Sequence, residues 1–542
     1  MTTPTDPPAP SATEHEVNAL ALRRAIELHQ QGALQQAAAL YLDILAIEPD
    51  HFDALHLLGV YALQADDAAA GFDLIARAIE IDPRQALAHV NLGVTLQKLG
   101  RRDDAITSYQ RALALEPEHL TALNNCANTL LDMQRYDDAI AYFERALRID
   151  PAYPEALNNL GYTLIETGRH TEALVCLARA LEVNPDYVAA HFNRANALQY
   201  LNQLEAAQQS YGAVLQREPT HVDANFNEGV CRLLAGDYQA GLPKYEWRWR
   251  KEGYRQLLQG FTQPLWQGLE ALHGRTILLH SEQGSGDTIQ FCRYAPALAA
   301  LGAKVLLRVQ PALVSLLSGL DGVHRVIGDN EPLPAYDMHC PIMSLPARFL
   351  SRPDTLPAPA RLTPDPARVR AWGKRLGEHG GGAGAGRIGV CWSGNPEHDN
   401  DTRRSIRLIQ FQRLLAGPGH FVSLQKDVRA VDRLLLERDA DTGFARLARF
   451  EAELTDFAET AALIANLDLI VTVDTAVAHL AASMEKPVWL LLPFAPDWRW
   501  MRERADSVWY ATMRLWRQPS PGDWDSVLNA VAERLERGWN VD

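Results

Sequence analysis

The stretch LIVTVDTAVAHLAASMEKPVWLLL, residues 469–492, decides how the C-terminal part of the chain folds. Its pattern predicts a buried strand, a polar turn, a short helix and, after Pro487, a second buried strand. Apolar runs without alternation are typical of parallel strands that are covered on both faces. In such sheets, ligands bind at the carboxyl ends of the strands, where helix N-termini offer free N–H groups to anions. Asp474, Thr475 and His479 therefore stand where the phosphates of a nucleotide are expected.

Length, charge and cysteine usage limit the classes of protein that the chain can form. At 542 residues it is too long for one hydrophobic core, which indicates about two to four domains. The net charge of −15 and the pI of about 5.6 argue against a nucleic-acid partner. The six cysteines form no CxxC pair and no cluster with histidine, which favours a reducing compartment without structural zinc.

The N-terminal residues 1–14 are polar and proline-rich, which predicts a disordered lead rather than a signal peptide. No apolar run approaches the roughly 20 residues that span a bilayer, so we expect no membrane span. The cytoplasm is the expected location.

Residues 15–255 repeat with a period of 34 residues, at which proline, small residues and large apolar residues all recur. The prolines are Pro49, Pro83, Pro117, Pro151, Pro185 and Pro219. A unit of this length with two amphipathic helices resembles the tetratricopeptide repeat, and we expect six full repeats and a partial seventh. Such repeats stack into an all-α solenoid whose concave face binds an extended segment of a partner.

An asparagine series with the same period lies on the first helix of successive repeats. Its members are Asn91, Asn125, Asn159, Asn193 and Asn227. A side-chain amide has donors and an acceptor that match a peptide N–H and C=O, so the ladder is a candidate site for a protein or peptide. Alternatively, each asparagine bonds within its own repeat or merely follows the repeat consensus. The ladder resembles that of the O-GlcNAc transferases, which join such a solenoid to a glycosyltransferase.

Residues 270–355 predict a first α/β half. Strands are expected at 275–280, 304–309 and 323–327, with 336–339 in the last connection, and the βαβ repetition indicates a parallel sheet. The turn after the first strand contains Gly284 and Gly286, which allow the backbone to approach an anion. Residues 356–386 are rich in proline and glycine and predict a linker between two sheets.

Residues 387–542 predict a second half of the same kind, closed by a C-terminal helix. Strands at 387–392, 421–424 and 469–473 each end in polar or small residues, which we expect to converge at one edge of the sheet. The polar loop after the first of these strands carries Arg403, Arg404 and Ser405. Residues 493–518 are rich in tryptophan and arginine, and we interpret them as domain-closing core in preference to a sugar-binding platform.

Two Rossmann-like halves after a solenoid look like a GT-B glycosyltransferase. The Gly286-Asp287 turn and the segment DTAVAHL at 474–480 are similar to those of the bacterial heptosyltransferases. The whole chain resembles bacterial tetratricopeptide proteins that carry such a C-terminal domain, through SEQGSGDTIQF at 281–291, DTAVAHLA at 474–481 and PDWRW at 496–500.

The resemblance implies roles for individual residues. Asp287 would be the general base that deprotonates the acceptor, Asp474 and its neighbours would hold the donor, and Arg404 with Ser405 would stabilise the departing diphosphate without a metal. The residues expected to bind the donor are Gly284, Gly286, Ser393, Gly394, Asn395, Arg404, Ser405, Gln425, Lys426, Asp474, Thr475, Ala476 and His479. Two departures from the heptosyltransferases are Ala476 in place of glycine and the lack of a phosphate-loop lysine.

The leading hypothesis is an inverting, metal-independent glycosyltransferase that uses a nucleotide sugar and a protein acceptor presented by the solenoid. The alternative is a scaffold whose transferase-like domain binds nucleotide without turnover. Simpler roles also remain open for single residues: Asp287 and Asp474 as helix N-caps, and His479 as a buried helix histidine.

Overall fold

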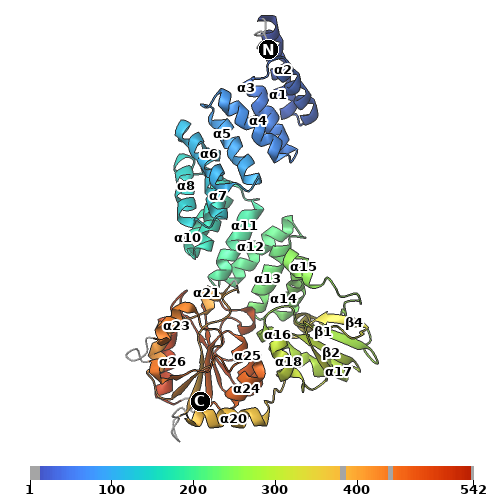
Figure 1. The fold of residues 1–542 in the computed structure, drawn as a ribbon, viewed down its shortest axis with the longest axis vertical. Coiled ribbons are helices and arrows are strands. Elements are labelled where there is room, and N and C mark those ends of the chain that lie inside the picture. Colours follow the sequence, from blue (N-terminus) through green and yellow to red (C-terminus); the bar gives the residue numbers. More distant parts are fainter. Residues whose placement is uncertain (1–11, 379–385, 399, 438–443, 539–542) are drawn as a thin grey trace, which may run out of the picture. The chain divides into compact units, whose positions relative to one another are not determined.

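The computed structural model describes residues 12–378, 386–398, 400–437 and 444–538. The chain divides into two compact units, Met1–Ala197 and Leu198–Asp542. A helical repeat solenoid is followed by two parallel α/β sheets, which is the fold class predicted from the sequence (Figure 1). Helix α1 begins at Ala12 rather than at residue 15. The rest of the predicted lead, residues 1–11, and the glycine run of the predicted linker at 380–385 lie outside the described residues.

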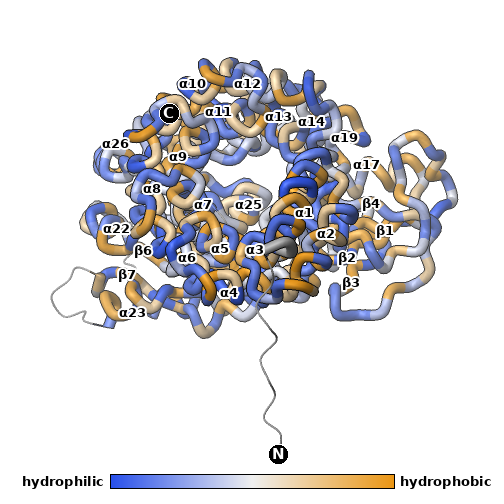
Figure 2. The backbone as a smooth tube through the Cα atoms, turned by 90° about the horizontal axis from the view of Figure 1, so that it is seen from above, coloured by the Kyte–Doolittle hydropathy of each residue, from blue (hydrophilic) through white to orange (hydrophobic). Residues whose placement is uncertain are grey.

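The solenoid is built from helix pairs along which apolar and polar residues alternate (Figure 2). Its helices are α1 (Ala12–Gln30), α2 (Leu34–Ile47), α3 (Phe52–Gln64), α4 (Ala68–Ile81), α5 (Ala86–Lys98), α6 (Arg102–Leu115), α7 (Leu120–Asp132), α8 (Tyr136–Ile149), α9 (Pro154–Glu166), α10 (His170–Val183), α11 (Val188–Tyr200), α12 (Leu204–Arg217), α13 (Val222–Leu234) and α14 (Tyr238–Tyr245). The boundary between the compact units falls inside α11, so α12 to α14 belong to the second unit.

Each helix pair is closed by a turn that contains one residue with positive φ. These residues are Gly32, Asp66, Gly100, Gln134, Gly168, Asn202 and Gly236. Glycine adopts this conformation at little cost, and asparagine and aspartate tolerate it better than other side chains. The positive-φ conformation therefore recurs once in every repeat, although the type of residue that adopts it changes.

Close packing within each pair explains the small and large residues that recur in the sequence. A Cβ atom added at Gly59 would lie 2.6 Å from Ile75 Cγ1, and one added at Gly161 would lie 2.7 Å from Leu177 Cγ. At Gly93 it would overlap the ring of Tyr109, which is fully buried. The glycine of the first helix thus makes room for the large side chain of the second.

The first sheet of the second unit has the strand order β3-β2-β1-β4, and all its strands are parallel. The strands are β1 (Thr276–His280), β2 (Lys304–Val309), β3 (Val323–Gly328) and β4 (Met338–Pro341), with α16 (Ser285–Phe291), α17 (Ala295–Ala300) and α18 (Pro311–Leu317) between them. The assignment of residues 336–339 to a connection was wrong, because they run into β4, which pairs with β1. The polar His339 interrupts the apolar run that would otherwise predict a strand.

The second sheet has the order β10-β9-β8-β5-β6-β7 and is also parallel. Its strands are β5 (Arg387–Cys391), β6 (His420–Ser423), β7 (Leu447–Ala448), β8 (Leu469–Val473), β9 (Val488–Leu492) and β10 (Met513–Arg517). The helices around it are α20 (Pro366–Glu378), α21 (Asp401–Arg404), α22 (Leu408–Leu415), α23 (Ala430–Glu437), α24 (Phe457–Ala465), α25 (Ala476–Ser483) and α26 (Trp524–Glu536). Strand β10 was not predicted, because its arginines break the apolar pattern.

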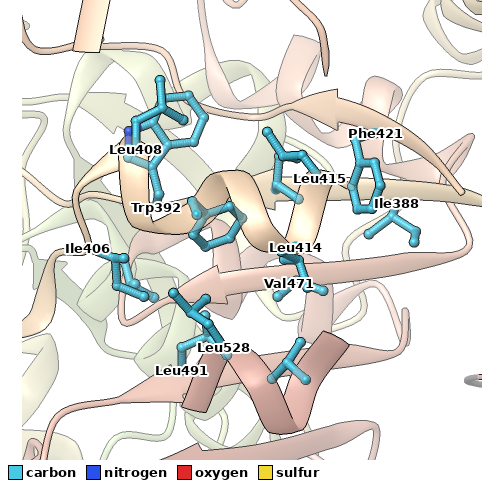
Figure 3. Packing of buried hydrophobic residues seen from close by; sticks show 14 of the residues in the cluster. Ile388, Trp392, Ile406, Leu408, Leu414, Leu415, Phe421, Val471, Leu491 and Leu528 are labelled. Carbon is cyan, nitrogen blue, oxygen red and sulfur yellow. The ribbon is translucent and has the colours of Figure 1, made fainter. Parts of the chain in front are cut away.

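A core of buried apolar side chains holds the second sheet against its helices (Figure 3). Trp392 and Val471 extend from the region of β5 and β8, Leu408 comes from α22, and Leu528 comes from α26. The indole N–H of Trp392 donates to the buried carboxylate of Asp432 at 2.9 Å. This anchor fixes the residue that immediately precedes the loop after β5. No helix among the described residues is long and apolar enough to cross a membrane.

The end of the solenoid is tied to the first sheet by a buried ion pair. Arg248 lies in the 3-10 helix η1 (Glu246–Arg250) directly after α14, and Glu282 follows β1. Arg248 Nε is 2.9 Å from a Glu282 carboxylate oxygen, and both side chains are 0% exposed. Glu246 pairs with Arg248 at 2.6 Å and with Arg348 at 2.8 Å. The turn after β1 is therefore fastened to the last repeat.

The last two repeats also contact the second half of the α/β region. The rings of Tyr238 and Trp498 lie 5.9 Å apart. In the turn after α11, the Asn202 side chain donates to the Phe494 carbonyl, and Arg502 donates to the Asn202 carbonyl at 2.9 Å. Both halves of the α/β region are thus attached to the same helices.

The packing of Gly93 predicts how the solenoid responds to substitution. Gly93→Ala should lower the free energy of unfolding by about 1–3 kcal/mol, because the added methyl group overlaps Tyr109. Gly212→Ala in α12 should instead raise it by about 0.5–1 kcal/mol, because that site is open and alanine favours a helix. Urea denaturation of both full-length variants measures the difference, and equal effects of the two would contradict the packing described.

Candidate functional site

The strand order of the second sheet places two loops at a point where the connections diverge. From β5 the chain proceeds to β6 and β7 on one side and then returns to β8 and β9 on the other. Open α/β sheets bind ligands at the carboxyl ends of their strands at such a switch point. The loop after β5 begins with Ser393 and Gly394, and the loop after β8 contains Asp474 and Thr475.

Asp474 is held by contacts to two other segments. The Trp500 indole N–H donates to its carboxylate at 2.8 Å, and Arg404 Nη1 donates to its backbone carbonyl at 3.1 Å. Burial raises the pKa of Asp474 to about 6, and the charge of Asp497 adds to this effect, while the Trp500 hydrogen bond and Arg404 oppose it. Asp474 is thus a partly buried carboxyl that changes charge near neutral pH.

Arg404 lies flat on the loop after β5. A Cβ atom added at Gly394 would lie 2.6 Å from Arg404 Nη2, so glycine is required there by the guanidinium. Arg404 Nε and Ser393 Oγ are both buried, and neither has a hydrogen-bond partner among the described residues. Buried polar groups are nearly always bonded, so these two orphaned groups indicate hydrogen-bonding capacity that a ligand would use.

Ser405 and Gln425 hold this loop in place through hydrogen bonds to its backbone. Ser405 Oγ accepts from the Gly394 N–H at 3.0 Å and donates to the buried Asp401 at 2.7 Å. The Gln425 amide accepts from the Ser393 N–H and donates to its carbonyl, each at 3.1 Å. Both residues are at least nine-tenths buried, which places them as supports of the loop rather than at its surface.

Two predicted donor residues lie at the exposed margin. Lys426 is exposed, and its Nζ contacts the Thr455 carbonyl at 3.4 Å. Asn395 is also exposed, and its side chain accepts from the N–H of Glu397 at 3.1 Å. The structure does not bring these two side chains together with Arg404 and Asp474, and their contact with a donor stays a prediction.

His479 is an internal residue of α25 and is 4% exposed. Its Nδ1 lies 3.1 Å from the Tyr510 hydroxyl, and its ring stacks on Trp500 with 5.4 Å between centroids. Burial lowers the pKa of His479 well below its ordinary value, so the imidazole is neutral. These contacts favour the alternative of a buried helix histidine, and contact with the donor remains a prediction.

Helix α16 of the first half packs against α25 of the second. A Cβ atom added at Gly286 would lie 3.0 Å from His479 Cδ2 and 3.3 Å from Ala476 Cα. Gly286 therefore allows the start of α16 to approach the start of α25, where Thr475 is the N-cap residue. Gly284 is the exposed N-cap of α16.

Asp287 lies in the first turn of α16, and its carboxylate pairs with the Arg499 guanidinium. Burial raises the pKa of Asp287, and the charge of Arg499 opposes this effect. Arg499 belongs to the 3-10 helix η5 (Trp498–Trp500), so the candidate base is contacted by the other half.

Arg499 and Trp500 are site residues that the sequence analysis did not assign to the site. Both were interpreted as domain-closing core, and both are buried. They also contact the two candidate carboxylates, Trp500 at Asp474 and Arg499 at Asp287. The feature of the sequence that points to Arg499 and Trp500 is the PDWRW segment at 496–500, where charged and aromatic residues alternate.

Three members of the asparagine ladder, Asn91, Asn159 and Asn193, bond to neighbouring repeats. Asn159 Nδ2 donates to Asn128 Oδ1 at 3.0 Å, and Asn193 Nδ2 donates to Asn158 Oδ1 at 3.0 Å. These amides thus link one repeat to the next, an arrangement that differs from the expected bonding within a single repeat.

Asn91 Nδ2 lies 2.8 Å from Nε2 of His56 on α3, in the neighbouring repeat. The other two members differ in their surroundings. Asn227 hydrogen-bonds with Tyr211. Asn125 is partly buried; its backbone carbonyl accepts from Thr129 Oγ1 at 2.8 Å, and its side chain makes no hydrogen bond to a neighbouring repeat among the described residues. It is therefore the member best placed to bond to a peptide.

Comparison with family models defines the class of protein. Three tetratricopeptide repeat models match residues 84–152, 130–199 and 192–246. A model of glycosyltransferase family 9 (heptosyltransferase) matches residues 452–491, a segment that contains Asp474 and His479 but neither Asp287 nor Arg404. The chain thus carries tetratricopeptide repeats followed by a glycosyltransferase-like domain.

Among curated proteins, the chain is similar to Protein FlbA of Caulobacter vibrioides, with 24% identity over 294 residues. The match covers 50% of this chain and 48% of FlbA, so the chain spans about half the length of this relative.

Among solved structures, the chain is similar to two proteins, MamA and PilF. The MamA protein is 22% identical, and the match covers 32% of this chain and 93% of MamA with a TM-score of 0.29. PilF of Pseudomonas aeruginosa is also 22% identical. The match covers 39% of this chain and 93% of PilF with a TM-score of 0.34.

The raised pKa of Asp474 predicts a pH-dependent stability. The folded protein favours the protonated carboxyl. The contribution of Asp474 to the free energy of unfolding is therefore full below pH 4 and is lost as pH rises through about 6. The Asp474→Asn variant has no such carboxyl. Its free energy of unfolding, relative to that of the wild type at the same pH, should therefore rise by about 2–3 kcal/mol between pH 4 and 8. Denaturation across this range measures the gain. In the control Asp506→Asn the sign should be opposite, because Arg504 lowers the pKa of Asp506.

Proposed function

We propose that this protein is a cytoplasmic glycosyltransferase that binds a nucleotide-sugar donor at the switch point between β5 and β8. The observation that carries the proposal is the pair of buried groups Arg404 Nε and Ser393 Oγ, which lack hydrogen-bond partners among the described residues. Arg404 Nε lies 4.0 Å from the Asp401 carboxylate, beyond hydrogen-bond distance, and Arg404 Nη1 bonds to the Asp474 carbonyl just before α25. A guanidinium and free helix N–H groups both favour a phosphate. The match of residues 452–491 to a glycosyltransferase family supports the same class of donor.

In the proposed reaction, an acceptor hydroxyl attacks the anomeric carbon of the donor sugar. A new carbon–oxygen bond forms there while the bond to the diphosphate oxygen breaks, and the nucleoside diphosphate leaves with the electron pair. Asp287 takes the hydroxyl proton, which a carboxylate does as a general base. Attack from the face opposite the leaving group inverts the anomeric configuration. Arg404 stabilises the departing negative charge, the task that a metal performs in other transferases.

The acceptor that we propose is a protein or peptide held by the solenoid. Tetratricopeptide repeats bind extended partners on their concave face, and the asparagine series lies on the first helix of five successive repeats. Asn125 supports this role most directly, because the amides of Asn159 and Asn193 already bond to neighbouring repeats.

A second candidate function is nucleotide binding without turnover, in a scaffold protein. It is favoured by Ala476 in place of the usual glycine at the start of α25 and by the ion pair that engages Asp287. The two functions differ at Asp287, since Asp287→Asn abolishes transfer in an enzyme but leaves donor binding intact in both cases.

Donor binding can be tested by thermal shift with ADP-, GDP- and UDP-sugars. A ligand at about 100 times its Kd stabilises the folded state by about 2.7 kcal/mol. Arg404→Met should weaken binding by about 10- to 100-fold, because a charge-assisted hydrogen bond is worth about 1.5–3 kcal/mol. The control Arg413→Gln removes an arginine of α22 that bonds to Asn529, and it should bind as the wild type does.

Isothermal titration of the nucleotide sugar with the largest shift gives the Kd of each variant. If none of the three classes of nucleotide sugar binds, the proposed function is wrong. Equal affinities of Arg404→Met and the wild type would instead show that the donor does not bind at the loop after β5.

Binding of the acceptor can be tested with an array of extended peptides of varied sequence. Asn125→Ala should reduce peptide capture by about 2- to 10-fold, the loss expected for one or two hydrogen bonds. Its melting temperature should stay close to the wild-type value, because no hydrogen bond within the solenoid is lost. Asn184→Ala, at the exposed C-cap of α10, is the control for peptide capture; its side chain accepts from the Asp186 N–H at 3.1 Å, so its melting temperature is measured alongside. Unchanged capture by Asn125→Ala would favour a purely structural ladder.

A further inference from the structure

Arg499 is a buried cation at the contact between the two halves of the second unit. It lies in η5, in the segment that follows β9, and its side chain is 6% exposed. Each nitrogen atom of its guanidinium has a partner. Nε donates to Gln290 Oε1 at 2.7 Å, Nη1 to the Asp497 carboxylate at 2.8 Å, and Nη2 to the Asp287 carboxylate.

The partners of Arg499 come from both halves. Asp287 and Gln290 lie on α16 of the first half, about one helical turn apart, whereas Asp497 lies in the same segment as Arg499. The bonds from Arg499 to α16 therefore join the two halves, and the guanidinium is the counter-charge of Asp287.

Two aromatic rings fix the position of the guanidinium. Its central carbon lies 5.2 Å from the Phe291 ring centroid and 4.9 Å from the Trp498 ring centroid. Rings at this distance attract a cation through their quadrupole, and the attraction is stronger where water is excluded. The aromatic contacts and the three polar partners together leave Arg499 one arrangement.

We propose that Arg499 is a positioning residue for sugar transfer, which orients the Asp287 carboxylate from the other half of the second unit. This inference rests on the proposed function, in which Asp287 is the general base. It adds that the base on α16 is held in place by a residue of η5.

The chemistry of the pair explains why the residue is an arginine. A buried carboxyl without a counter-charge favours the protonated form, which cannot accept a proton from the acceptor. The planar guanidinium presents donors in several fixed directions, so one side chain can hold Asp287, Gln290 and Asp497 together. A lysine ammonium would supply the charge without this fixed geometry.

Other charged and titratable groups face Asp287 from the elements packed around it. Asp497 raises the pKa of Asp287, and His398, in the loop after β5, lowers it. His479 on α25 is close to Gly286 and is neutral. Arg499 opposes the effect of burial more strongly than any of these groups.

The test uses the full chain and the ADP-, GDP- or UDP-sugar that gives the largest thermal shift. Water serves as the acceptor, and release of the nucleoside diphosphate is followed as a function of pH. Arg499→Met should lower kcat by roughly 10²-fold, the loss typical of a misplaced catalytic group, with little change in KM for the donor. The acid limb of its pH profile should move to higher pH, because loss of the cation raises the pKa of Asp287.

Arg499→Lys keeps the charge, so its acid limb should stay near the wild-type position while kcat falls less than in Arg499→Met. Arg504→Gln removes an arginine of the same segment that pairs with the exposed Asp506, and it is the control expected to match the wild type. If Arg499→Met does not fold, as circular dichroism would show, Arg499→Lys decides, and a wild-type kcat for it overturns the inference.

The outcomes separate this inference from the proposed function. Turnover with an unmoved acid limb in Arg499→Met overturns the positioning role alone and leaves the glycosyltransferase. A lack of turnover in the wild type with every nucleotide sugar that binds removes both.

Discussion

The ion pair between Arg248 and Glu282 is the constraint on which the arrangement of the second unit depends. Both side chains are withdrawn from water, so the cost of desolvation has to be offset by their mutual attraction and by additional hydrogen bonds. Those bonds are present: Arg248 donates to Ser344 Oγ at 2.9 Å, and Glu282 accepts from the Met343 N–H at 2.9 Å. Removing either partner of such a pair leaves the other as an unpaired buried charge, which is strongly destabilising. It fixes the turn that leads from β1 to Asp287.

The sequence contained most of the fold because two physical signals are local. Recurrent proline and small residues determine helix length and packing distance within one repeat, so the solenoid follows from its period. Unbroken apolar runs mark the strands that are buried on both faces, which identified β1, β2, β5, β8 and β9. The signal failed at β4, where His339 stands within the strand, and at β10, where Arg514 and Arg517 alternate with apolar residues.

The site was less predictable because the partner of a polar side chain depends on tertiary contacts. Strand-end positions placed Ser393 and Asp474 near one another, and the resemblance to heptosyltransferases added Arg404. In the structure Arg404 contacts both the loop after β5 and the Asp474 carbonyl. The same rule assigned Gln425 to the donor, whereas its amide bonds to the backbone of the neighbouring loop. Arg499 could not be assigned in this way, since two of its three polar partners, Asp287 and Gln290, lie more than 200 residues away in sequence.

The boundary at Ala197, inside α11, has a consequence for dissecting the molecule. A cut at the apparent end of the repeats, after η1, would strip Tyr238 from its contact with Trp498 and leave Glu282 as a buried charge without its arginine. A fragment of the α/β region that keeps these contacts must therefore retain α12 to α14 and η1, which belong to the second unit. The last repeats pack with the two sheets, although their sequence continues the period of the solenoid.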